Sequence, residues 1–320
     1  QLHQVYSSES TREWAASGCR SAGIGCLESK QPVIDQRTTA TRDWHSAYPA
    51  PAKLNLFLHV VGRRADGYHL LQTLFRLLDY GDTLHFSPRD DTTVNLCTPL
   101  PGVDPENDLT VRAVRLLQAA TGCRQGVDIA LSKRLPLGGG LGGGSSDAAT
   151  VLLALNHLWR LGLSRQDLQR IGLTLGADVP FFIFGRNAFA EGVGENLQAL
   201  ALPTTYYLVV EPPVTVSTAT IFGAAELRRD TPAIRVEQWQ AGFGGNDLQP
   251  VAVARFPVIG DYLDRLSDVA PARMTGSGAC IFAEFASRVD AEAAHRSLPP
   301  TWRSWIAAGV DEHPLRPLAD

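Results

Sequence analysis

A glycine-rich run is the part of this 320-residue sequence whose composition and spacing most clearly indicate chemistry. Six of the seven residues from Gly138 to Gly144 are glycine, and Ser145 and Ser146 follow directly. Glycine lets the backbone turn its N–H groups toward an anion, and a helix N-terminus adds partial positive charge at the same place. The run therefore predicts a polyphosphate-binding loop, with a flexible linker as the alternative.

An apolar-periodic segment follows the loop and favours the binding interpretation. Ala148, Leu152, Leu155 and Trp159 recur at spacings of 4, 3 and 4 residues, which predicts a helix with one buried face. A P-loop would need Lys-Ser or Lys-Thr after its last glycine, and a dinucleotide fold would need a following strand that ends in an acidic residue. Neither pattern is present, so the loop indicates a third phosphate-binding design.

A strand with two polar residues on one face is predicted near the start of the ordered sequence. Leucine and valine alternate with other residues from Lys53 to Val60, so Lys53 and Asn55 should project side by side from the opposite face. The local pattern alone favours a solvated lysine at the edge of a sheet.

Three other segments contain candidate site residues. Tyr68 and His69 offer a stacking ring and a hydrogen-bonding ring after a glycine turn, or they are half-buried turn residues. Asp178 lies between a predicted helix and the apolar run 181–184, predicted as a strand, where an acidic residue usually caps a helix or faces water. The small residues of Thr275–Cys280 permit close approach to a substrate, or form an ordinary turn.

The composition excludes several classes of protein. A content of 44% hydrophobic residues over 320 positions supports a large core and suggests two domains. The net charge of −4 gives no overall basic field for nucleic acid, and no apolar stretch approaches the length of a membrane span. Five scattered cysteines without a C-x-x-C pair predict a cytoplasmic protein with neither a disulfide framework nor a zinc site.

The first 45 residues differ from the rest of the chain. They are rich in Ser, Thr, Arg and Gln, show no clear periodicity, and begin at Gln1 rather than at methionine. They lack the apolar core of a secretory signal, and their acidic residues argue against a transit peptide. We expect residues 1–45 to be a disordered extension or an artefact of how the start of the gene was assigned.

Taken in order, the motifs resemble those of the GHMP kinases. The segments that carry the resemblance are Pro51–Leu56, Gly67–His69, Gly138–Ser146, Gly176–Pro180 and Thr275–Cys280. The resemblance covers the sequence from about Trp44 to the C-terminus. It implies an α+β fold with a ribosomal protein S5 domain 2-like N-terminal domain at 46–203 and a ferredoxin-like C-terminal domain at 204–320. The substrate would bind in the cleft between them.

The resemblance also implies a catalytic pair and an ATP site. Asp178 would be the catalytic carboxylate and Lys53 the ammonium that assists it, in place of the local interpretations given above. ATP and Mg²⁺ are the implied cofactors. The implied ATP-binding residues are Pro136, Gly138, Gly139, Gly140, Leu141, Gly142, Gly143, Gly144, Ser145 and Ser146.

Within the superfamily, the motifs are most similar to those of members that phosphorylate the 2-hydroxyl of 4-diphosphocytidyl-2-C-methyl-D-erythritol. The implied substrate-binding residues are Asn55, Tyr68, His69, Thr218, Phe222, Gly276 and Ser277. The alternatives are another GHMP kinase, acting on homoserine, mevalonate or a sugar, and a non-catalytic nucleotide sensor of the same fold. We expect a small-molecule substrate, no nucleic-acid or membrane partner, and a monomer or homodimer.

Asp147 departs from the usual family pattern, in which asparagine follows the two serines. A carboxylate in the first turn of a helix is favoured by the helix dipole, but it repels a nearby triphosphate unless it points away or binds Mg²⁺. We favour an outward-facing capping role, with Mg²⁺ ligation as the alternative.

Overall fold

The structure, a computed structural model, describes residues 42–319. Most of the expected extension at 1–45 lies outside the described residues. Its last four residues do not behave as an extension, because Trp44 packs against the hydrophobic core and the carbonyl oxygen of Arg42 lies 2.8 Å from Nε2 of His157. All the described residues fall within one compact unit, and the domain boundary near residue 203 stays a prediction.

Groups of strands and groups of helices follow one another along the described chain. The strands are β1 (Tyr48–Arg63), β2 (His69–Arg89), β3 (Val94–Leu96), β4 (Gly126–Ser132), β5 (Ala188–Gly192), β6 (Asn196–Ala199), β7 (Tyr206–Glu211), β8 (Ala272–Met274), β9 (Ile281–Phe285) and β10 (Arg303–Val310). The α-helices are α1 (Leu109–Thr121), α2 (Gly143–Leu158), α3 (Arg165–Leu173), α4 (Val179–Phe184), α5 (Thr218–Phe222), α6 (Gln249–Arg255), α7 (Pro257–Ser267) and α8 (Arg288–Ser297). Short 3₁₀ turns occupy Pro105–Asn107, Val236–Gln238 and Arg316–Ala319.

The long strand β2 connects the sheet. It pairs with β1 along one edge, and successive parts of it pair with β5, β10 and β4. The strand order is β3-β4-β2-β10-β7-β9-β8, and every pairing is antiparallel except that of β3 with β4. Because β10 pairs with both β2 and β7, strands from both halves of the sequence belong to one sheet. The mainly antiparallel sheet with its helices agrees with the α+β class that was expected.

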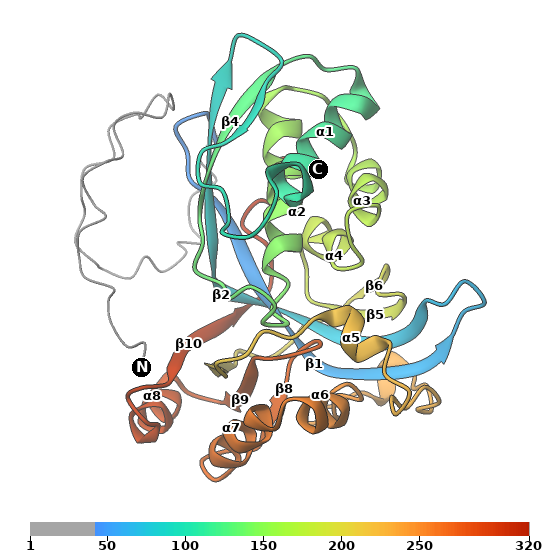
Figure 1. Ribbon diagram of the computed structural model, residues 1–320, viewed down its shortest axis with the longest axis vertical. Coiled ribbons are helices and arrows are strands. Elements are labelled where there is room, and N and C mark those ends of the chain that lie inside the picture. The colour runs from blue at the N-terminus through green and yellow to red at the C-terminus, as the bar shows by residue number, and fades with distance from the viewer. Residues whose placement is uncertain (1–41, 320) are drawn as a thin grey trace, which may run out of the picture. The chain divides into compact units, whose positions relative to one another are not determined.

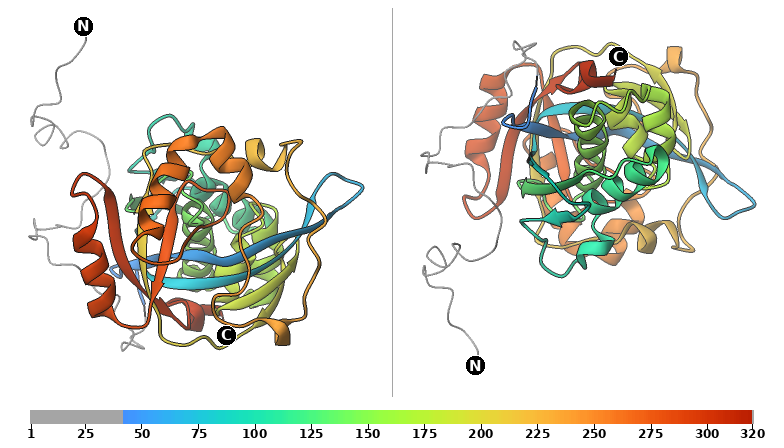
Figure 2. Two further views of the ribbon diagram at one scale, coloured as in Figure 1. Left: turned by 90° about the horizontal axis from the view of Figure 1, so that it is seen from below. Right: turned by 90° about the horizontal axis from the view of Figure 1, so that it is seen from above.

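The helices form two groups. In Figure 1, α1 to α4 gather beside β1, β2 and β4, whereas α6, α7 and α8 lie near β8, β9 and β10. The turn between β1 and β2 projects to one side in both views of Figure 2. This turn ends at Tyr68, so the predicted stacking ring is carried on a protruding part of the chain.

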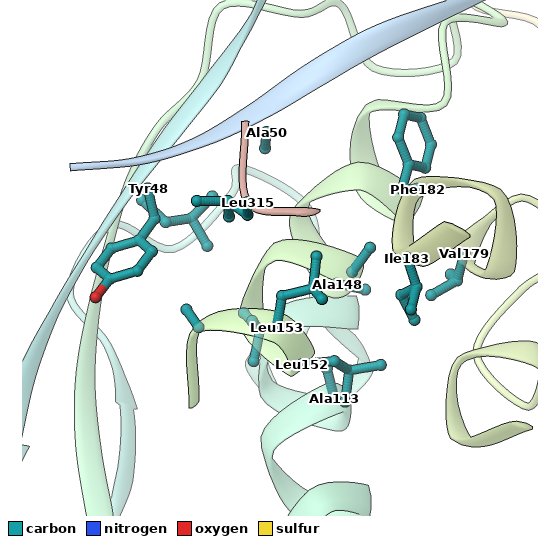
Figure 3. Close-up of a cluster of buried hydrophobic side chains, with 14 of the residues drawn as sticks. Tyr48, Ala50, Ala113, Ala148, Leu152, Leu153, Val179, Phe182, Ile183 and Leu315 are labelled. Atoms are coloured by element: carbon teal, nitrogen blue, oxygen red, sulfur yellow. The ribbon is translucent and has the colours of Figure 1, made fainter. Parts of the chain in front are cut away.

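Helix α2 lies at the centre of the first hydrophobic core, as its apolar periodicity predicts. Ala148, Leu152 and Leu155 are fully buried, and Trp159 at the end of the helix is nearly so. Figure 3 shows Ala148, Leu152 and Leu153 of α2 near residues of α1, α4 and the start of β1. Burial of each large aliphatic side chain stabilises the fold by about 1.5–3 kcal/mol, so this core fixes the helix whose N-terminus faces the site.

One cysteine departs from the expectation drawn from the sequence. Cys97 is disulfide-bonded, which was not expected for a chain predicted to lack a disulfide framework, whereas Cys123 and Cys280 are free thiols. Sequence spacing does not give the distance between Cα atoms that decides whether two thiols can bond. Across residues 42–319, no helix is both long and apolar enough to cross a bilayer.

Candidate active site

A cavity of about 870 Å³ is lined by segments that are far apart in the sequence. They include β1, β2, the glycine-rich loop with the first turn of α2, the residue before α4, helix α5 and the loop after β8. The predicted residues that line it are Lys53, Asn55, Tyr68, His69, Pro136, Gly138 to Gly144, Ser145, Asp178, Thr218, Phe222, Gly276 and Ser277. The fold therefore brings the predicted catalytic, ATP-binding and substrate-binding residues together, with the exception of Ser146.

The glycine-rich loop needs glycine for both its conformation and its packing. Gly138, Gly140 and Gly142 have φ values of 66°, 74° and 73°, which side-chain-bearing residues rarely adopt. A Cβ atom on Gly140 would stand 2.2 Å from the carbonyl oxygen of Thr275. The loop is thus pressed against the loop after β8, and this close contact forms one wall of the cavity.

The N-terminus of α2 presents unpaired backbone donors beside the cavity. The first N–H groups of a helix have no partner within the helix, and no side chain at Gly142 caps them here. Gly143, Gly144 and Ser145 form this first turn and line the cavity. The arrangement suits an anionic group such as a phosphate.

Ser146 does not take the role predicted for it. It is fully buried, and its hydroxyl donates a hydrogen bond to the carbonyl oxygen of Pro51 at 2.7 Å. The prediction of ATP binding is therefore wrong for this side chain, because one further residue of helical rotation turns it from the cavity toward the core. Its hydroxyl instead fastens α2 to β1.

Lys53 and Asp178 form an ion pair at the cavity. Lys53 Nζ lies 3.4 Å from Asp178 Oδ2 and donates to Asn55 Oδ1 at 2.5 Å. Lys53 is only 3% exposed, and its backbone N–H donates to the carbonyl oxygen of Leu141 in the glycine-rich loop. The local interpretation of a solvated edge lysine is therefore wrong, because the loop covers β1 at this point.

Asp178 occupies the N-cap position of α4, yet its side chain makes no capping hydrogen bond. Its carboxylate is therefore available to Lys53 and to the cavity. The apolar run 181–184 was expected to be a strand and is a helix instead, with Pro180 in its first turn. Proline is favoured there because its fixed φ suits a helix start and its missing N–H has no helical partner. A short apolar run does not by itself distinguish the two structures.

Asn55 is held by two buried threonines that sequence reasoning did not select. Its amide donates to Thr73 Oγ1 at 2.9 Å, and its backbone N–H donates to Thr275 Oγ1 at 3.0 Å. Thr275 begins the small-residue motif already noted in the sequence, which was the one available signal. Thr73 had no sequence signal, because it becomes a partner only through the pairing of β1 with β2.

The predicted base-binding residues lie at the other end of β1 and β2. The Tyr68 ring is 64% exposed, whereas the His69 and Phe222 rings are half-buried, with their centroids 5.1 Å apart. Burial lowers the pKa of His69, and the charges of Arg229 and Arg63 lower it further. A neutral imidazole beside two aromatic rings is suited to a flat, polar ligand.

A buried charge cluster lies beneath the glycine-rich loop. Lys133 Nζ lies 2.6 Å from both Asp82 Oδ2 and Asp147 Oδ2, and Lys133 also lines the cavity. Asp147 is 2% exposed, so the favoured interpretation of an outward-facing cap is wrong. Its side chain turns inward to Lys133, a partner that sequence reasoning missed although it lies just before the loop.

The chemistry of Asp147 follows from this position. Burial raises its pKa to about 7, Lys133 opposes the change, and Asp82 reinforces it. Its Oδ1 atom is buried without a hydrogen-bond partner in the structure. Among residues 42–319, no three His, Cys, Asp or Glu side chains are grouped so that they could hold a metal ion.

Comparison with known proteins defines the class of this chain. Residues 108–186 match the family model for the GHMP kinases N terminal domain, and residues 231–303 match the model for the GHMP kinases C terminal domain. A homoserine kinase structure from Cytophaga hutchinsonii is similar at a TM-score of 0.60 and 19% identity, over 83% of this chain and 94% of that one, which shows the shared fold. The chain is a kinase with the GHMP fold.

More similar relatives define the family within that class. The 4-diphosphocytidyl-2-C-methyl-D-erythritol kinase of Dechloromonas aromatica is 62% identical over 85% of this chain and 100% of its own length. That of Aromatoleum aromaticum is 62% identical over 84% and 94% of the two chains. A crystal structure of 4-(cytidine 5'-diphospho)-2C-methyl-D-erythritol kinase matches with a TM-score of 0.72 and 36% identity, over 82% and 99%. The chain belongs to the 4-diphosphocytidyl-2-C-methyl-D-erythritol kinase family.

Proposed function

We propose that this kinase transfers the γ-phosphoryl group of ATP to the 2-hydroxyl of 4-diphosphocytidyl-2-C-methyl-D-erythritol, in the non-mevalonate route to isoprenoid precursors. The observation that carries the proposal is that the Lys53–Asp178 pair shares one cavity with both the glycine-rich loop and the aromatic residues of the β1–β2 turn. The names of the relatives supply the identity of the acceptor.

The nucleotide would bind along the glycine-rich loop. The N–H groups of Gly143, Gly144 and Ser145 at the start of α2 would receive its phosphates, and Pro136 and Gly138 line the adjacent wall. The described residues supply no grouped metal ligands, so we propose that Mg²⁺ enters bound to the phosphates of ATP. When bound, the ion supplies positive charge that neutralises the transferring phosphoryl group.

The acceptor would extend from the reacting pair to the β1–β2 turn. Its cytosine would stack between Tyr68 and Phe222, with His69 at the polar edge of the base. At the opposite end, Asn55 and Thr218 would hold the methylerythritol. The hydroxyls of Thr218 and Ser277 lie 2.8 Å apart, so α5 and the loop after β8 are already joined at this point, and the adjacent Gly276 also lines the cavity.

Phosphoryl transfer then requires mainly alignment and charge stabilisation. As the acceptor oxygen bonds to the γ-phosphorus, the bond to the β,γ-bridging oxygen breaks and ADP leaves. The proton of the acceptor hydroxyl passes to Asp178. Lys53, held by Asn55 and Asp178, stabilises the negative charge around the attacking oxygen.

Release of ADP by the purified chain tests this proposal when ATP, Mg²⁺ and single acceptors are supplied. We expect turnover with 4-diphosphocytidyl-2-C-methyl-D-erythritol and little with homoserine, mevalonate, galactose or 2-C-methylerythritol. The Asp178→Asn variant controls for ATP hydrolysis without transfer. Equal turnover with 2-C-methylerythritol would contradict the proposed recognition of the base, and ATP binding without turnover on any acceptor would favour a sensor. We also propose that the enzyme acts in the cytoplasm as a monomer or homodimer.

A further inference from the structure

One arginine outside the cavity lining joins two of the three predicted base-binding residues, His69 and Phe222. Arg229 Nε donates to His69 Nε2 at 3.0 Å. Its Nη2 donates to the carbonyl oxygens of Phe222 and Ala224, at 3.2 and 2.6 Å, and its Nη1 donates to that of Leu227 at 2.8 Å. A single side chain therefore fixes the His69 ring and the end of the helix that carries Phe222.

The contact between Arg229 and His69 determines where the imidazole carries its proton. A guanidinium group can only donate hydrogen bonds, so the ring nitrogen that faces it must present a lone pair. A neutral imidazole carries one N–H, which leaves His69 with its proton on Nδ1. Burial and the positive charges of Arg229 and Arg63 lower the pKa of His69, which favours the neutral ring.

The Nδ1–H group is available to a ligand. His69 lines the cavity, and no residue within 42–319 forms a hydrogen bond with its Nδ1 atom. A donor at this place distinguishes the two common pyrimidines, because N3 of cytosine is an acceptor whereas N3 of uracil bears a hydrogen. With the opposite tautomer, His69 would present a lone pair there and would favour uracil.

We propose that Arg229 is a positioning residue that sets pyrimidine specificity by holding His69 as the Nδ1–H tautomer, so that its donor meets N3 of cytosine. This inference rests on the proposed function, since it concerns the base of the acceptor. It adds a residue that makes no contact with the substrate and acts through His69.

Kinetics with two acceptors test the role of Arg229. We expect the wild-type enzyme to prefer the cytidine acceptor over its uridine analogue by at least about tenfold in kcat/KM, the effect of one directed hydrogen bond. In Arg229→Met, the KM for the cytidine acceptor should rise about tenfold and the preference should fall to about twofold or less. The KM for ATP should stay the same. Arg228→Met is the matched control, because this neighbouring side chain forms an ion pair with Asp230 and, among residues 42–319, no hydrogen bond with His69.

Two further measurements separate tautomer control from a general structural effect. Nitrogen-15 NMR of the imidazoles should show His69 protonated on Nδ1 in the wild type and no longer held in that form in Arg229→Met. In a His69→Ala background, Arg229→Met should change the base preference by less than about twofold, because coupled residues are not additive. A thermal melt shows whether each variant is folded.

The outcomes distinguish this inference from the proposed function. An inactive wild-type enzyme on the cytidine acceptor would refute the proposed function itself. An active enzyme in which Arg229→Met keeps the cytidine preference, or in which His69 carries its proton on Nε2, would overturn the role of Arg229 and leave the proposed function intact. A loss of stability with the base preference unchanged would also overturn it, since that result describes a residue that only supports α5.

Discussion

Replacement of Asp147 by asparagine should remove a pH-dependent cost from the folded state. An aspartate normally has a pKa of about 3.9, whereas burial raises that of Asp147 to about 7. A tenfold change in a protonation equilibrium is worth about 1.4 kcal/mol. The difference of about three pH units therefore makes ionised Asp147 cost the folded protein about 4 kcal/mol.

The sign of the effect follows from proton binding. Between about pH 4 and pH 7, the folded chain holds a proton on Asp147 that the unfolded chain has lost. The stability contributed by this group is thus fully present at low pH and is lost as the pH rises through this window. Asparagine does not titrate, and Lys133 keeps Asp82 as its partner in the variant. The stability of Asp147→Asn relative to wild type should therefore increase by about 2 kcal/mol from pH 5.5 to pH 7.5.

Urea unfolding of both proteins at these two pH values measures the effect. Asp261→Asn is the control, because it removes the same charge from an exposed position on α7. Parallel stability curves for Asp147→Asn and wild type would refute the reasoning. A variant less stable than wild type at pH 7.5 would also refute it, because ionised Asp147 and Lys133 would then stabilise the fold. Since Asp147 is buried, the Mg²⁺ needed for the half-maximal rate should stay the same in Asp147→Asn.

Single substitutions at three other features of the site give further tests: the ion pair, the aromatic rings and Thr275. Asp178→Asn and Lys53→Ala should each lower kcat by about 100-fold or more, with the Kd for ATP little changed in calorimetry, because the loop holds the phosphates. Tyr68→Ala and Phe222→Ala should mainly raise the acceptor KM, by about fivefold or more if stacking contributes at least about 1 kcal/mol; an unchanged KM would remove the base from this position. Thr275→Val should lower kcat about tenfold, because the backbone N–H of Asn55 loses the hydroxyl that accepts its hydrogen bond; Thr275→Ser keeps a hydroxyl and should retain the rate.

Much of the site could be predicted because many of its residues lie close together in short segments of the sequence. The glycine-rich run and the apolar periodicity after it predict a phosphate-binding loop followed by a helix, and the structure has the helix, with the loop lining the cavity. Lys53 and Asp178 could not be assigned in this way. Each looked like an ordinary surface charge, and only the order of several motifs indicated that they meet across 125 residues of sequence.

The errors share a physical cause, because they concern contacts that depend on tertiary packing. The inward turn of Asp147 depends on Lys133, and the burial of Ser146 depends on the approach of β1. Residues 181–184 form a helix because they pack into the core beside α2, where a short apolar run suits either structure. Local pattern indicates which residues can do chemistry, but packing decides which of them face the cavity.

The direction of the hydrogen bonds around Asn55 explains why a neutral residue is suited to this position. An ammonium group only donates, so Asn55 must turn its Oδ1 toward Lys53 and its amide hydrogens toward Thr73. The Thr73 hydroxyl then donates to the carbonyl oxygen of Phe57, so this line of hydrogen bonds ends in the sheet. An aspartate at position 55 would place a second carboxylate beside Lys53, in addition to that of Asp178. The two carboxylates and the one ammonium group would then carry a net charge of −1. With asparagine, the ammonium is oriented without a further negative charge, so in the proposed reaction its positive charge would stay available to the transferring phosphoryl group.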